Sequence, residues 1–270
     1  MKILALDFDG VIVDSVLDSL FIGHNAYLRL CSQGKKKNFG GELFTFENWE
    51  EIKKHYQKEI KYYRTLRPYI RGATDYGLIQ KLMEEKMFIK NQEEFDNYRE
   101  TVVFDFEAYE REFYQERERL QNIDYRAWFN LEPPYPKIIQ GMKKLLEEEI
   151  KIVIATSNRR KAIAKSFTPE YFGFTIDPKD ILDKRFGEDK SEQMRQIVKL
   201  YQVKFEEIYF VDDQINHLIQ TRPLGIKVIL AGWSYATEAQ KEEARKQDIL
   251  VIEREEDFYP LIKNALREKV

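Results

Sequence analysis

The chain opens with Met1-Lys-Ile-Leu-Ala-Leu-Asp7-Phe8-Asp9-Gly10-Val11-Ile12-Val13-Asp14, and the fold that we expect follows from this stretch. The apolar run Ile3–Leu6 is nearly continuous, which is typical of a strand buried on both faces of a parallel sheet. Such sheets bind ligands beyond the carboxyl ends of their strands, where Asp7 would lie. Alternate side chains of an extended chain share a face, so Asp7 and Asp9 can enter one space before the chain turns at Gly10. A solvated turn is the alternative, because Asp and Gly are common in turns.

The overall charge argues against a nucleic-acid partner. The 270 residues, enough to bury a full core, include 47 acidic and 44 basic ones, and the net charge is −3. The compact basic run Lys35-Lys36-Lys37 stands among glycines and is typical of a solvated loop.

The composition also predicts a location. The single cysteine, Cys31, excludes an internal disulfide and favours a reducing compartment, so we expect a cytoplasmic protein. The opening apolar run is too short for a signal peptide. Because no segment approaches the ~20 apolar residues that span a bilayer, we expect no membrane association.

The pattern of apolar residues predicts an α/β protein with an inserted helical domain. Residues 15–131 contain almost no strand-like run and show helical patterns at 16–30, 46–63, 74–87 and 92–120. A proline cluster at 133–136 then indicates a linker. The remaining chain alternates helices with strands, which predicts a sheet of about five parallel strands including the first. We therefore expect a Rossmann-like, doubly wound parallel sheet from residues 1–14 and 132–270, with residues 15–131 inserted as a mainly helical cap over the crevice.

Four groups of polar residues stand at the carboxyl ends of expected strands or directly before a helix. They are Asp7–Gly10, Thr156-Ser157-Asn158, Lys190-Ser191 and Asp212-Asp213. The hydroxyl of Thr156 and the following N–H groups can bind phosphate oxygens at a helix start. A helix N-cap made by Ser157 or Asn158 explains the same pattern equally well.

The other two groups differ in how strongly they point to a ligand. A single lysine such as Lys190 is usually a solvated surface residue. Adjacent aspartates at a strand end are costly without a cation, so Asp212 and Asp213 favour a Mg²⁺ site. Together the four groups supply what phosphoryl transfer needs: a carboxylate nucleophile, a second carboxylate for proton transfer, metal ligands and donors to the phosphate oxygens.

The order and spacing of these groups resemble the haloacid dehalogenase-like (HAD) hydrolase superfamily. Asp7-Phe8-Asp9-Gly10 matches its first motif, Thr156 its second, Lys190 its third and Val211-Asp212-Asp213 its acidic fourth. The resemblance covers residues 1–13 and about 133–270. The insertion point is similar to that of the C1-cap subclass, which includes phosphoglycolate-phosphatase-like and β-phosphoglucomutase-like enzymes.

The resemblance implies a role for each residue. Asp7 would be the nucleophile that forms an aspartyl-phosphate, and Asp9 would protonate the leaving group and then activate the attacking water. Lys190 would hold Asp7 as well as the phosphoryl group. The implied phosphate-binding set comprises Gly10, Thr156, Ser157, Asn158 and Lys190.

The resemblance also implies Mg²⁺ as the cofactor. Its ligands would be the side chains of Asp7 and Asp213 and the backbone carbonyl of Asp9, with Asp212 assisting directly or through water. His217 stands where many members have Asp or Asn. The partner that supports the metal ligands is therefore open between His217 and Asn216.

The residue at position 9 separates branches of the superfamily. Dehalogenases and phosphonate hydrolases lack an acid there, so Asp9 favours a phosphatase acting on a small phosphorylated metabolite. A phosphomutase is the alternative. Its relatives carry a histidine in the first cap helix, where this chain has Ser19 with His24 one and a half turns away, and this favours hydrolysis. An alternative of another class is a non-catalytic member that binds a phosphometabolite or a protein, and the oligomeric state stays open.

The substrate would be selected by the inserted domain. The stretch Tyr69–Tyr76 is similar to the specificity loop of such caps, and Arg71 can meet an anionic group of the substrate there. A turn followed by a helix cap at Thr74 is the alternative. The insertion is longer than is usual for the subclass, so substrate identity does not carry over.

Overall fold

The structure, a computed structural model, describes residues 1–30, 38–187 and 189–267. The predictions for Cys31 and for Lys35-Lys36-Lys37 lie outside these ranges. The chain divides into two compact units, Met1–Asp14 with Pro133–Val270 (the core unit) and Ser15–Glu132 (the helical unit). Across the described ranges, no helix is long and apolar enough to cross a membrane.

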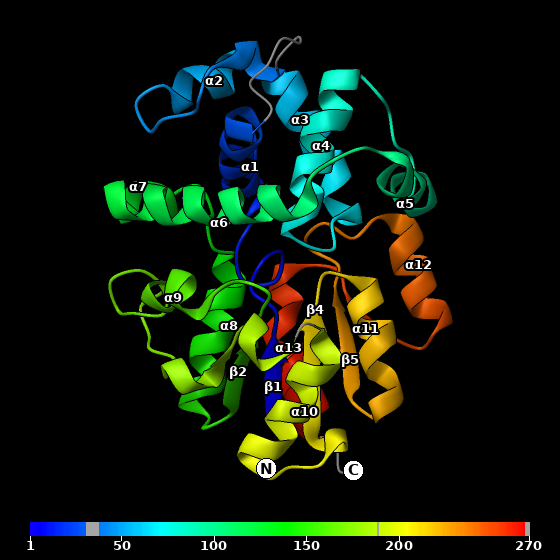
Figure 1. The fold of residues 1–270 in the computed structure, drawn as a ribbon. Coiled ribbons are helices and arrows are strands. Elements are labelled where there is room, and N and C mark those ends of the chain that lie inside the picture. Colours follow the sequence, from blue (N-terminus) through cyan, green and yellow to red (C-terminus); the bar gives the residue numbers. More distant parts are fainter. Residues whose placement is uncertain (31–37, 188, 268–270) are drawn as a thin grey trace. The chain divides into compact units, whose positions relative to one another are not determined.

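The core unit is built on one parallel sheet. In its described part six strands pair in the order β3-β2-β1-β4-β5-β6 (Figure 1). Their bounds are β1 (Ile3–Leu6), β2 (Lys151–Ala155), β3 (Ile181–Leu182), β4 (Ile208–Asp212), β5 (Lys227–Ala231) and β6 (Leu250–Ile252). The doubly wound parallel sheet predicted from the sequence is confirmed. The prediction missed β3, because a strand of two residues has no detectable periodicity.

The strand order reverses beside β1, and this position decides where a ligand can bind. Leu6 is level with Ile154 of β2 on one side and with Val211 of β4 on the other. The amide N–H of Asp7 continues the pairing by donating to the carbonyl of Val211 at 3.0 Å. Because ligands of open α/β sheets bind at such switch points, residues just beyond β1, β2 and β4 are the first candidates for a site.

Helices cover both faces of the sheet, as Figure 1 shows for α10 in front of it and α13 behind it. Their bounds are α8 (Pro136–Glu147), α9 (Arg160–Ile163), α10 (Lys190–Tyr201), α11 (Ile215–Thr221), α12 (Glu238–Lys246) and α13 (Phe258–Arg267). One face of the sheet forms a buried cluster with Met194 of α10, Leu218 of α11 and Ala244 of α12. The central strands β1, β2 and β4 are therefore mostly apolar, because helices cover both faces of the sheet.

The helical unit is all-helical in its described part, apart from loops. Its helices are α1 (Val16–Leu30), α2 (Trp49–His55), α3 (Gln57–Leu66), α4 (Ala73–Glu85), α5 (Gln92–Thr101), α6 (Phe106–Ile123) and α7 (Tyr125–Phe129). Helix α1 begins at Val16, as expected from the sequence. The long helices expected at 46–63 and 92–120 were wrong, because the first breaks at Tyr56 and the second before Asp105, whose carboxylate caps α6.

A buried ion pair stabilises the helical unit. Arg117 of α6 donates to Asp18 of α1 at 2.6 Å, and the indole N–H of Trp128 in α7 donates to the other Asp18 oxygen at 2.7 Å. Asp18 is fully buried, so replacing Arg117 would remove a positive charge that compensates its carboxylate.

Candidate active site

The loop after β1 depends on a glycine. Gly10 has φ +74°, and a Cβ placed there would lie 2.7 Å from Cγ of Asp213. Its N–H donates to the carbonyl of Val13 at 2.8 Å, which closes the turn. Only glycine combines this left-handed conformation with so close an approach, so Gly10 keeps the loop against Asp213.

Lys190 links the loop after β1 to the ends of the neighbouring strands β2 and β4. Its Nζ donates to Asp7 Oδ1 at 2.8 Å and to the carbonyl of Ala155 at 2.5 Å, and it lies 3.7 Å from Asp212 Oδ2. The side chain is buried, so the reading of Lys190 as a solvated surface residue is wrong. It is the first residue of α10, and Asp189 caps that helix by accepting from the N–H of Glu192 at 2.8 Å.

Burial and nearby charges shift the protonation of this pair. Burial raises the pKa of Asp7 to about 6, with Lys190 opposing this rise and Asp212 and Asp9 adding to it. Burial by itself lowers the pKa of Lys190, but the charges of Asp7 and Asp212 outweigh it and hold that pKa above its ordinary value. Lys190 therefore remains a buried cation among several carboxylates.

Three buried aspartates form a potential metal site. One carboxylate oxygen each from Asp7, Asp212 and Asp213 lies within 4.8 Å of the other two. Oxygen ligands of this kind suit a hard divalent cation such as Mg²⁺. Lys190 lies near the carboxylates of Asp7 and Asp212 and also feels the charge of Asp213, so the negative charge of the three aspartates exceeds that of this one ammonium group and the donor set fits such an ion.

Asp212 is held at both of its oxygens. Oδ1 accepts from the backbone N–H of Gln214 at 2.8 Å, and Oδ2 lies 3.0 Å from Nδ1 of His217. Burial raises the pKa of Asp212, but the neighbouring His217 and Lys190 outweigh burial and bring it below its usual value. Of the two partners that the sequence left open, His217 therefore contacts the acidic pair.

The chain after β2 contributes a hydroxyl and an amide. Thr156 is buried, and its Oγ1 accepts from the N–H of Asn158 at 3.0 Å. The side chain of Asn158 donates to Asp9 Oδ2 at 2.8 Å. Ser157 is exposed, and α9 begins two residues beyond Asn158 without a side-chain cap. The helix-cap reading of Ser157 and Asn158 is therefore wrong.

Two polar residues near the segment after β2 were not predicted from the sequence. Gln193 donates to the carbonyl of Thr156 at 2.9 Å and is buried. It lies one turn after Lys190 on α10, and that helical spacing is the signal that could have found it. Asp183 follows β3 and accepts from the N–H of Arg160 at 2.9 Å; it was missed together with its strand.

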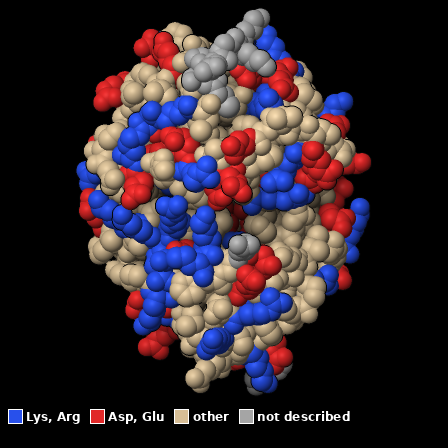
Figure 2. Space-filling model, in the orientation of Figure 1, with Lys and Arg blue, Asp and Glu red and all other residues tan. Residues whose placement is uncertain are grey.

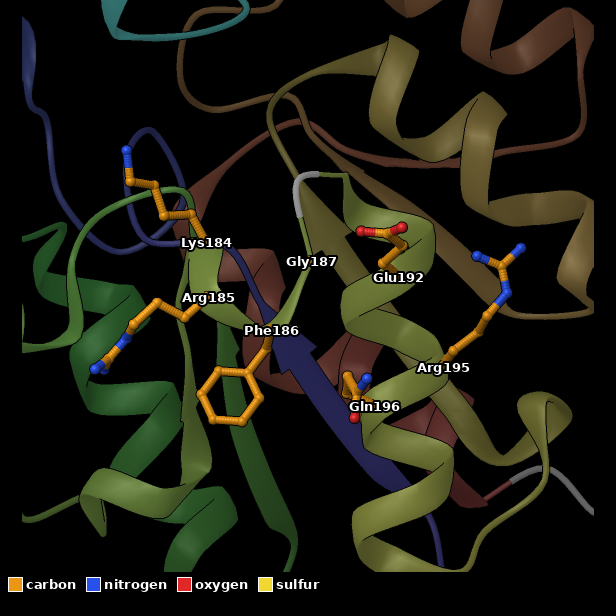
Figure 3. Close-up of a pocket in the computed structure, with 7 residues that line it drawn as sticks. All are labelled: Lys184, Arg185, Phe186, Gly187, Glu192, Arg195 and Gln196. Atoms are coloured by element: carbon orange, nitrogen blue, oxygen red, sulfur yellow. The ribbon is translucent and has the colours of Figure 1, made fainter.

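A basic pocket of about 480 Å³ lies beside the start of α10. It is lined by Lys184, Arg185, Phe186, Gly187, Glu192, Arg195 and Gln196. Figure 3 shows that Arg185 and Arg195 point away from each other, so the cations do not converge on one ligand position. Arg185 instead pairs with Asp183 at 2.9 Å, which indicates a structural role.

Arg71 lies in the helical unit, where its guanidinium contacts Asp96 at 2.6 Å and remains 45% exposed. Helix α4 begins at Ala73 after Gly72 without a side-chain cap, so the cap reading of Thr74 is wrong. Contact between Arg71 and a substrate stays a prediction.

Ser19 and His24 are both buried inside the helical unit. Ser19 donates to the carbonyl of Val16 at 3.0 Å. His24 lies 2.8 Å from the carbonyl of Glu42 and stacks on Phe44 at 4.1 Å between ring centroids. The packing around His24 indicates a structural role for this histidine in α1.

Solved structures share the fold of the whole chain at low sequence identity. A predicted phosphoglycolate phosphatase from Haemophilus somnus is 14% identical with a TM-score of 0.58, and the match covers 97% of this chain and 98% of that one. A candidate phosphoglycolate phosphatase from Lactobacillus delbrueckii is 14% identical with a TM-score of 0.63, and both chains are covered completely (100%). A candidate β-phosphoglucomutase from Thermotoga maritima is 15% identical with a TM-score of 0.53, covering 98% of this chain and 100% of that one.

The family follows from a comparison at the level of sequence. Curated protein sequences provide no significant match. The family model of the haloacid dehalogenase-like hydrolases matches residues 1–220, which include β1, the helical unit and the Asp212-Asp213 pair. The chain belongs to the haloacid dehalogenase-like hydrolase family.

Proposed function

We propose that the protein is a Mg²⁺-dependent phosphatase that hydrolyses a small phosphorylated metabolite through an aspartyl-phosphate on Asp7. The observation that carries this proposal is the buried contact of Lys190 with Asp7 beside Asp212 and Asp213, at the switch point of the sheet. A nucleophile needs to be held in one orientation, and the lysine provides both that orientation and a positive charge for the phosphoryl oxygens.

The proposed reaction has two halves. In the first, a carboxylate oxygen of Asp7 forms a bond to phosphorus while the ester P–O bond breaks, and Asp9 gives its proton to the departing oxygen. In the second, water attacks the phosphorus of the aspartyl-phosphate and gives a proton to Asp9. Inorganic phosphate and the free carboxylate of Asp7 result. Lys190 and the N–H groups after Thr156 would stabilise the negative charge of the phosphoryl oxygens.

A divalent cation would be held by Asp7, Asp213 and the backbone carbonyl of Asp9, with Asp212 contributing directly or through water. When bound, Mg²⁺ would neutralise charge on the phosphoryl oxygens and on the aspartates. Gly10 supports this assignment, because it allows the loop after β1 to lie against Asp213.

The decisive experiment is phosphate release from p-nitrophenyl phosphate and a metabolite panel. The panel includes 2-phosphoglycolate and hexose phosphates because of the names of the structural relatives. We expect turnover that needs Mg²⁺, stops with a chelator and falls to background in Asp7→Asn. Asp248→Asn is the matched control, because Asp248 is an exposed aspartate of the core unit. Activity that survives Asp7→Asn, or that needs no metal, would exclude the proposed mechanism.

The same panel tests the alternatives. A phosphomutase is supported by the fold of the T. maritima relative, and isomerised sugar phosphate forming faster than free phosphate would favour it. A non-catalytic member would bind a phosphometabolite or a protein tightly without turnover. A cytoplasmic location stays a prediction from the single cysteine, and fractionation of cells expressing the protein would test it.

A further inference from the structure

The side chain of Asn158 is held rigidly against Asp9. Its Nδ2 donates to Asp9 Oδ2 at 2.8 Å, and the residue is only 5% exposed. The backbone N–H of Asn158 donates to Thr156 Oγ1 at 3.0 Å. Thr156 is fixed in turn, because its N–H donates to the carbonyl of Leu182 at 3.0 Å and its carbonyl accepts from Gln193 at 2.9 Å. Consecutive hydrogen bonds therefore connect β3, through Thr156 and Asn158, to the carboxylate of Asp9.

The two oxygens of Asp9 have different surroundings. Oδ2 accepts the amide hydrogen of Asn158, whereas Oδ1 is buried with no hydrogen-bond partner among the described residues. The amide of Asn158 therefore fixes the carboxyl group of Asp9 through Oδ2.

We propose that Asn158 is a positioning residue that orients the carboxyl group of Asp9 for the proton transfers of the reaction. This inference rests on the proposed phosphatase function. The O–H bond of protonated Asp9 breaks as the leaving oxygen separates from phosphorus and takes the proton. The Asp9 carboxylate then accepts one proton from the water that attacks the aspartyl-phosphate. Asn158 thus acts on proton transfer, in contrast to the phosphate-binding role expected from the sequence.

The two roles of Asn158 differ in how the reaction depends on the leaving group. Nitrophenolate leaves without much help from an acid, whereas an alkoxide needs the proton of Asp9. The measurement is kcat/KM of Asn158→Ala on p-nitrophenyl phosphate and on an alkyl phosphate from the panel, since kcat/KM reports the steps up to the aspartyl-phosphate. We expect a loss of about tenfold or more for the alkyl phosphate and less than about threefold for p-nitrophenyl phosphate. Equal losses on both would overturn the proposal, because both substrates share the phosphoryl group.

Two further variants separate the hydrogen bond from packing. Asn158→Asp keeps the shape of the side chain but removes the N–H donor, so it should lose at least as much activity on the alkyl phosphate as Asn158→Ala. Retained activity in Asn158→Asp would contradict the role. Asn264→Ala changes an exposed asparagine of α13 and should behave as wild type.

A double variant tests whether Asn158 acts through Asp9. Asp9→Asn alone shows how far kcat/KM for the alkyl phosphate falls when proton transfer is lost completely. Adding Asn158→Ala to Asp9→Asn should lower this kcat/KM no further. An additional loss of the same size as in the single variant would show that Asn158 acts elsewhere. If the wild type releases no phosphate from any substrate, the proposed function fails. If phosphate release depends on Asp7 but the leaving group makes no difference, only the role of Asn158 fails.

Discussion

At the scale of single residues, the distance between a glycine and its neighbours decides whether the site tolerates a larger side chain there. Gly10 and Gly225 both have positive φ, +74° and +90°, but they differ in their surroundings. A Cβ on Gly10 would collide with Asp213, whereas the nearest atom to a Cβ on Gly225 is 4.0 Å away. Substitution of Gly225 would therefore cause backbone strain alone, whereas substitution of Gly10 would also displace Asp213, a proposed metal ligand.

Gly10→Ala should weaken Mg²⁺ binding and reduce activity by more than tenfold, because the methyl group displaces the carboxylate of Asp213. Gly225→Ala should cost about 1–2 kcal/mol of stability through the same left-handed strain and leave Mg²⁺ affinity unchanged. Calorimetric Mg²⁺ titration and thermal unfolding of both variants measure the difference. Equal Mg²⁺ affinity in the two variants would show that the close contact with Asp213 does not matter.

Arg71 is a residue whose predicted role concerns the substrate. Arg71→Ala should raise KM about tenfold for a substrate with a second anionic group and leave p-nitrophenyl phosphate unaffected, because a charge-assisted hydrogen bond is lost only with the former. Steady-state kinetics on both substrates measures this. Arg111→Ala serves as the control, since Arg111 is an exposed arginine of α6. A KM unchanged on every anionic substrate would remove Arg71 from the binding site.

At the scale of elements, the packing of α1 makes the helical unit sensitive to pH. His24 projects from α1 into a buried space between Glu42, Gln80 and Phe44. Burial lowers the pKa of His24 to about 4, although the hydrogen bonds with Glu42 and Gln80 oppose this change. A histidine in an unfolded chain has a pKa of about 6.5.

Between pH 6.5 and pH 4 the unfolded state therefore binds more protons at His24 than the folded state does. The contribution of His24 to the unfolding free energy is present above about pH 6.5 and is lost as the pH falls toward 4. Between pH 7 and pH 5 the loss should be about 2 kcal/mol, and His24→Gln should lack it. Urea unfolding at both pH values measures the change. His55→Gln, which alters an exposed histidine of α2, should keep the full pH dependence, and identical slopes in both variants would contradict the assignment.

At the scale of the whole molecule, the carboxylates of the site come from parts of the chain that are far apart in sequence. Asp7 follows β1, while Asp212 and Asp213 lie at and beyond the end of β4, and pairing of these two strands brings them together. The surface offers a contrast, since Figure 2 shows acidic and basic side chains of the described residues interspersed over the visible face. A small charged ligand at the buried aspartates fits this distribution better than a polyanion does.

Mg²⁺ should stabilise the folded protein, because the three aspartates converge only when the sheet is formed. At a concentration of 100 times the dissociation constant the gain is about 2.7 kcal/mol. Thermal unfolding should therefore shift upward with Mg²⁺ and return with a chelator, and the shift should disappear in Asp213→Asn. Asp248→Asn should retain it. A Mg²⁺-dependent shift of full size in Asp213→Asn would place the cation elsewhere.

The predictions that succeeded from the sequence depend on local patterns. The continuous apolar runs at β1 and β2 identify buried parallel strands, and the spacing of apolar residues predicts the start of α1 at Val16. The order of Asp7, Lys190 and Asp212 along the chain points to the family. The boundaries of the later helices failed, because the breaks at Tyr56 and before Asp105 depend on capping and packing that periodicity does not report.

By itself, the sequence determined the parallel α/β class, the inserted helices and the motif order of the family, because burial and motif order are properties of neighbours along the chain. Only the tertiary structure decided which side chains meet. His217 contacts Asp212, Gly10 lies against Asp213, and the amide of Asn158 reaches Asp9 across 149 positions of sequence. Such contacts follow from strand order and register, which bring distant residues within hydrogen-bond distance and leave no local pattern in the chain.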